Sequence, residues 1–65
     1  MVRVMRFYDV TLTFRIGVQL VQPTIKHIPA LDEKDAFFKA LATSTATSAR
    51  ERGADVTVLR VQESD

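Results

Sequence analysis

The regular alternation of apolar and polar residues between positions 8 and 20 limits the possible folds of this chain more than any other feature. The apolar positions are Tyr8, Val10, Leu12, Phe14, Ile16, Val18 and Leu20. Successive side chains of a β-strand point to opposite faces of the sheet, so this period predicts a ribbon with one buried and one exposed face. The rest of the chain must supply a layer that covers the even-numbered face.

The length of this pattern predicts a turn inside it. A single strand that spans the whole alternating pattern exceeds the usual length of about 3–10 residues, and Gly17 is a natural place for the chain to reverse. We predict a hairpin with a two-residue turn at Ile16 and Gly17, which places Phe14 opposite Gln19. A looser turn over 17–19, or one long bent strand, is the alternative.

Residues 32–52 carry the start and stop signals of a helix. Asp32 is a suitable N-cap, Arg50 and Arg52 lie where the helix dipole favours cations, and Gly53 is a suitable residue to end the helix. Residues 43–48 are poor helix formers and need tertiary contacts to stay helical. The face predicted to pack on the sheet consists of Phe38, Leu41, Ala42, Thr45 and Ala49.

The predicted fold is a single α+β domain with the element order β-β-α-β. One amphipathic helix packs on one face of a three-stranded sheet, and the alternative is β-α-β with one long bent N-terminal strand. Proline is unable to donate to a sheet ladder, so Pro23 and Pro29 place the second strand at an edge. The alternation slips between Val58 and Leu59, which indicates a bulge or a central strand. The predicted elements are a strand over about 4–16, an edge strand over about 19–28, a helix over about 32–52 and a strand over about 55–62.

Length and composition predict association with another chain. With 65 residues and no cysteine, the protein has a small core and no disulfide to reinforce it. We expect a homo-oligomer, with a dimer favoured. The net charge of +1 gives no bulk attraction to nucleic acid or to an anionic membrane. No segment resembles a signal peptide or a membrane span, so a soluble, cytoplasmic protein is expected.

No residue constellation points to catalysis. Asp32, Glu33 and Asp35 are grouped, but a helix N-terminus accounts for their position. His27 is the only histidine, and no nucleophile or carboxylate lies at a recognisable spacing from it. The chain has no glycine-rich phosphate loop and no thiolate ligands. We therefore predict a protein that is not an enzyme and has no metal or cofactor.

The odd-numbered face of the first strand is the predicted functional surface, because one helix covers only the other face. Exposed Met, Phe and Arg are enriched at protein interfaces, so the sequence predicts an interaction module, such as an accessory or inhibitor protein. Its partner-binding residues are expected to be Arg3, Met5, Phe7, Thr11, Thr13 and Arg15. The alternative is a nucleic-acid-binding module in which bases stack on an aromatic ring beside arginines, using Arg3, Arg6, Phe7 and Arg15.

Overall fold

A computed structural model describes residues 4–64 and confirms the α+β class. Within that range, no helix has the length and apolar character needed to cross a bilayer. The elements in chain order are β1 (Arg6–Ile16), β2 (Gln19–Val21), β3 (Thr24–Ala30), α1 (Glu33–Leu41), α2 (Ser44–Glu51) and β4 (Asp55–Glu63).

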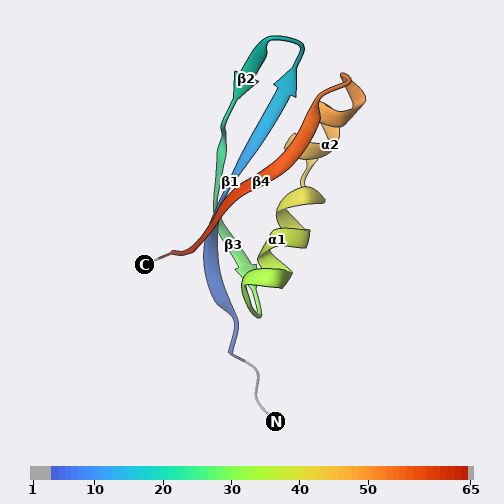
Figure 1. Cartoon of the computed structure of the whole chain (residues 1–65). Coiled ribbons are helices and arrows are strands. Elements are labelled where there is room, and N and C mark those ends of the chain that lie inside the picture. The colour runs from blue at the N-terminus through green and yellow to red at the C-terminus, as the bar shows by residue number, and fades with distance from the viewer. Residues whose placement is uncertain (1–3, 65) are drawn as a thin grey trace.

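The sheet is built around β1, which lies between β4 on one side and β2 and β3 on the other (Figure 1). All three neighbours run antiparallel to β1, so β3 and β4 are parallel to each other, as the crossover through a helix predicts. Because the chain reverses after β1, the hairpin is confirmed and the long bent strand is excluded.

The hairpin turn lies one residue later than predicted. Ile16 pairs with Gln19, so Gly17 and Val18 form the turn, and the predicted turn at Ile16 and Gly17 is wrong. Phe14 consequently lies opposite Val21. Gly17 has φ +58 and Val18 does not have a positive φ, which is the pattern of a type II′ turn. A β-branched isoleucine resists this positive φ, so glycine takes the first turn position.

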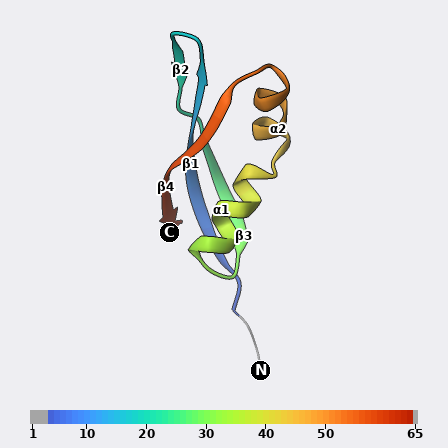
Figure 2. The same ribbon diagram turned by 45° about the vertical axis from the view of Figure 1, so that its right-hand side comes forward.

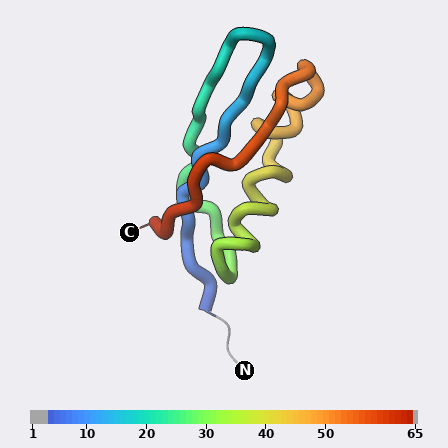
Figure 3. Tube along the Cα trace, in the orientation of Figure 1, coloured from blue at the N-terminus to red at the C-terminus, as the bar shows by residue number. Residues whose placement is uncertain are grey.

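The predicted edge strand is two strands. The chain passes through Gln22 and Pro23 between β2 and β3, and the Pro23 carbonyl still accepts a 2.9 Å hydrogen bond from the Leu12 amide. Figure 3 traces this return along one side of β1. β4 lies at the opposite edge, with a register shift that leaves Leu59 as an extra residue. The slip in its alternation is therefore a bulge, and the central-strand alternative is wrong.

The predicted helix over 32–52 is divided into α1 and α2. Asp32 caps α1 as predicted, since its carboxylate accepts a 2.8 Å hydrogen bond from the Asp35 amide. Thr43 then adopts an extended conformation and caps α2, accepting a 3.4 Å hydrogen bond from the Ala46 amide. A threonine that caps a new helix competes with continuation of the first one, which explains the division.

Both helices cover the even-numbered face of β1 (Figure 2). Val10 and Leu12 are the largest side chains that are completely buried. The helices contribute small residues to this core, namely Ala36, Ala40, Ala46 and Ala49. The predicted helix face is therefore right in part: Ala49 is buried and Leu41 packs against the core, but Phe38 is 58% exposed, and Ala42 and Thr45 are also exposed. The break at Thr43 changes the phase of the pattern after it, and alanines let the helices approach the sheet closely.

Candidate functional site

The predicted partner-binding residues do not form one compact patch. Arg3 lies outside the described residues, and Met5 precedes β1 with half of its surface exposed. Phe7 and Arg15 lie at opposite ends of β1, about 27 Å apart at ~3.4 Å per residue. Between them the surface is rich in hydroxyls: the Thr11 hydroxyl lies 3.0 Å from that of Thr24, and Thr13 pairs with Thr57. The middle of this open face therefore resembles ordinary solvated sheet.

Phe7 belongs to a small cluster around a bulge in β3. Its ring stacks on His27, with centroids 4.6 Å apart and planes 21° apart. His27 has φ +62, a conformation that residues other than glycine seldom adopt. Its amide donates a 3.1 Å hydrogen bond to Asp9 Oδ1, and its Nδ1 lies 3.5 Å from Ser64 Oγ. Asp9 thus holds the backbone and not the ring, so these residues do not form a catalytic relay.

The cations of the nucleic-acid alternative are not brought together. Arg6 lies on the even-numbered face of β1, and its Nε is 3.9 Å from Glu63 Oε1. Arg15 lies on the odd-numbered face at the other end of the strand, in register with Asp55. Phe7, the predicted stacking platform, already contacts the ring of His27. Within residues 4–64, Arg6 and Arg15 therefore do not form the continuous basic groove that tracks a nucleic-acid backbone.

The two edges of the sheet differ in how well they are blocked. β3 carries Lys26, the bulge at His27, and Pro29, three features that discourage pairing with another strand. β4 has a bulge at Leu59 and the charge of Arg60, but no proline. β4 is therefore the more open edge.

The orientation of α1 is fixed by contacts with the end of β3. Asp35 accepts a 3.0 Å hydrogen bond from the Leu31 amide and lies 3.0 Å from Lys39 Nζ. Lys39 also donates a 2.9 Å hydrogen bond to the Pro29 carbonyl. The Leu31 hydrogen bond, together with Lys39, lowers the pKa of Asp35. These contacts turn one side of α1 toward β3 and the other side toward β4.

An aromatic patch occupies the β4 side of α1. The rings of Phe37 and Phe38 meet edge to face, with centroids 5.4 Å apart. Together with Glu33, Lys34 and Val61 they line a shallow depression of about 400 Å³. The sequence pattern missed this patch because it placed Phe38 in the core. The signal available in the sequence is the adjacent pair itself, since two consecutive residues of a helix lie about 100° apart and do not point in the same direction.

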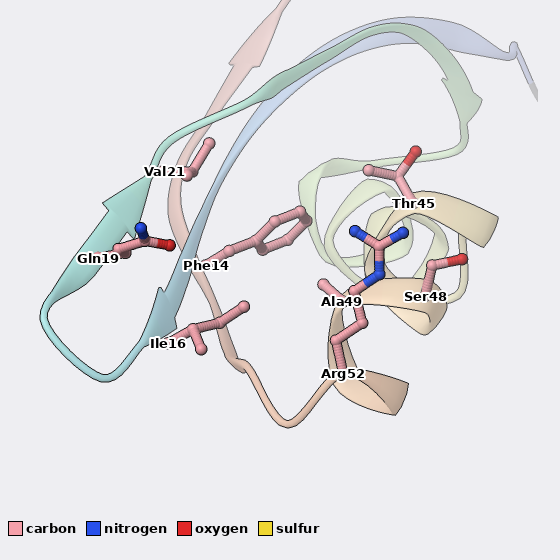
Figure 4. Close-up of a pocket in the computed structure, with 8 residues that line it drawn as sticks. All are labelled: Phe14, Ile16, Gln19, Val21, Thr45, Ser48, Ala49 and Arg52. Atoms are coloured by element: carbon pink, nitrogen blue, oxygen red, sulfur yellow. The ribbon is translucent and has the colours of Figure 1, made fainter.

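A second groove lies between the hairpin and α2 (Figure 4). Phe14 and Ile16 reach across from β1, while Ala49 and the side chain of Arg52 face them from the helix side. The groove has a volume of about 400 Å³, and Arg52 is the only charged residue in its lining. It offers apolar contact surface and no pair of groups suited to proton transfer or nucleophilic attack.

No protein-family model, curated protein or solved structure matches the chain. Within residues 4–64, no three acidic, histidine or cysteine side chains are grouped closely enough to hold a metal ion. The candidate site is therefore defined by exposed apolar surface and the open edge of β4.

Proposed function

We propose that the protein is a non-enzymatic interaction module that self-associates through its sheet, with a homodimer as the smallest assembly. The observation that carries this proposal is the imbalance between the core and the surface. Within the described residues, the large hydrophobic side chains that are buried are Tyr8, Val10, Leu12 and Ile28, and alanines make up the rest of the buried core. Eleven large hydrophobic residues in the same range are exposed.

The energetics of a chain this small support the same proposal. A 65-residue domain buries only about 60% of the surface of its unfolded chain. Below about 70–80 residues, a single core supplies only a few kcal/mol, and natural proteins add disulfides, a metal or a partner chain. The chain has no cysteine. Association with a second copy is then the most economical reinforcement, because it covers the exposed apolar residues.

The distribution of exposed side chains favours the sheet edge over the centre of the open face. Threonines dominate the open face between Phe7 and Arg15, and burying their hydroxyls without hydrogen bonds is unfavourable. An edge strand offers unpaired backbone N–H and C=O groups with which a second strand forms hydrogen bonds.

Thermal unfolding at several protein concentrations tests this proposal. If folding is coupled to association, Tm rises as the concentration rises, because the folded dimer is favoured by mass action. Circular dichroism at the lowest and highest practical concentrations measures this shift. A Tm that does not depend on concentration contradicts the proposal.

A further inference from the structure

We propose that the second copy docks along the β4 edge, antiparallel and about a two-fold axis, with Phe37 and Phe38 covering the seam on the helix side. This inference rests on the self-association proposed above and specifies its interface. The product is a continuous sheet that contains the four strands of each copy, eight in all, with the helices of both copies on the same face. Such an interface uses the same surface on both copies, as a two-fold dimer requires.

The backbone of β4 is prepared for this pairing. The Ser64 amide donates a 2.8 Å hydrogen bond to the Phe7 carbonyl, which fixes the alternation of the β1–β4 ladder. In an antiparallel ladder, alternate residues direct both backbone groups to the same neighbour. The groups of Val61 and Glu63 therefore point outward, where no strand within residues 4–64 pairs with them. The bulge at Leu59 interrupts this edge but leaves regular pairing with β1 on both sides.

The aromatic patch lies beside this edge and not beside the other. Contacts of Asp35 and Lys39 hold the opposite side of α1 against the end of β3. Phe37 and Phe38 are 36% and 58% exposed. With an accessible surface of ~200 Å² for each phenylalanine, these fractions leave about 190 Å² of aromatic surface exposed per copy. This area is roughly a quarter of the ~800 Å² that each partner buries in a standard protein interface. The paired strand and Leu59, which is 54% exposed, supply further area.

The charges around the patch do not oppose contact between identical copies. Glu33 and Lys34 line the depression with the aromatic rings. One acid and one base give the patch no net charge, so two copies meet without like-charge repulsion. By contrast, the β3 edge presents Lys26 without an ion-pair partner among the described residues.

A charge-insertion experiment tests the patch. Phe38→Lys places an ammonium group in the aromatic patch beside the seam, and Leu20→Lys makes the same change at a residue of matched exposure (57%) on the hairpin. Sedimentation velocity over a dilution series measures the dissociation constant of each variant. We expect Phe38→Lys to weaken the dimer at least about thirtyfold, as for an interface hot spot, and Leu20→Lys to weaken it less than about threefold. Equal effects of the two variants, or a larger effect of Leu20→Lys, overturn the inference.

A distance measurement tests the geometry independently of these substitutions. The chain has no cysteine, so Gln62→Cys and Val18→Cys each introduce a single site for a spin label. Gln62 is exposed and lies between Val61 and Glu63, so in the proposed dimer its labels lie close to the seam, within about 25 Å of each other, from the spacing of residues and strands. The labels at Val18 lie at opposite ends of the assembly, beyond ~35 Å.

Pulsed electron paramagnetic resonance distinguishes the outcomes. A short Gln62 distance with a long Val18 distance supports the β4 interface. A dimer in which the Gln62 distance is long overturns this interface and leaves self-association standing. A protein that shows no inter-label coupling and the mass of one chain at every concentration overturns both.

Discussion

Substitution of Gly17 by alanine isolates the backbone energy of the hairpin turn. Gly17 has φ +58, and a Cβ built at this position meets nothing within 4 Å. Steric clash therefore contributes nothing, and the cost is conformational. In the folded state, a positive φ costs an L-residue about 1–2 kcal/mol. In the unfolded state, alanine has less conformational freedom than glycine, which stabilises the folded protein by about 0.4–1 kcal/mol and offsets part of that cost. The free energy of unfolding should fall by about 1 kcal/mol.

Denaturant and thermal unfolding followed by circular dichroism measure this change, with all variants at the same protein concentration. A loss of 1 kcal/mol lowers Tm by about 4–8 °C in a domain of this size. Val18→Ala is the matched control, because Val18 is completely exposed and lacks a positive φ. Its effect should stay within about 0.5 kcal/mol. Equal stabilities of Gly17→Ala and the wild type refute a left-handed glycine turn at this position.

Two further substitutions examine the hydrogen bonds that shape β3 and α1. Asp9→Ala removes the acceptor of the His27 amide and should lower the free energy of unfolding by about 1 kcal/mol. Asp9→Asn keeps an oxygen at this position and should lower the free energy of unfolding by less. Equal decreases for the two variants in denaturant unfolding contradict this role of Asp9. The hydrogen bond from the Leu31 amide, together with Lys39, lowers the pKa of Asp35 in the folded protein. The ionised Asp35 carboxylate therefore stabilises the fold at pH values above its unfolded-state pKa, near 3.9. This stabilisation is lost as the pH falls through the lower folded-state pKa. Asp35→Asn should flatten this part of the acid unfolding curve, and an unchanged curve refutes the assignment.

The hairpin illustrates what local rules predict and where they stop. Strand length and Gly17 together predict a reversal, and the structure has one. The position of the turn was missed because Val18, an apolar residue, occupies the turn and is completely exposed. Alternation alone assigns such a residue to the buried face. Only the demand for a positive φ at the first turn position identifies the register.

The helical region shows a different limit. Asp32 and the weak propensity of residues 43–48 are visible in the sequence, but the division of the helix depends on Thr43 as a second cap. After this break, a face extrapolated along one continuous helix is out of phase. The buried positions are then chosen by how closely each helix approaches the sheet, which favours alanine and leaves Phe38 exposed. Helix propensity carries no information on this distance.

The residues around the β3 bulge were the least predictable. No local pattern marks His27 for a positive φ, since its conformation depends on Asp9 of the neighbouring strand and on stacking with Phe7. These contacts join residues that are distant in the sequence. The open edge of β4 likewise follows from the order of the strands, with β1 in the centre, and not from the composition of β4 itself.

The molecular mass of the folded protein in solution tests the central claim most directly. Sedimentation equilibrium of the wild-type chain, from low to high micromolar concentration, measures this mass while circular dichroism monitors folding. Self-association predicts twice the 7.3 kDa chain mass at the upper end and a reversible fall toward one chain on dilution. A mass of 7.3 kDa across the whole range, with the fold retained, contradicts it.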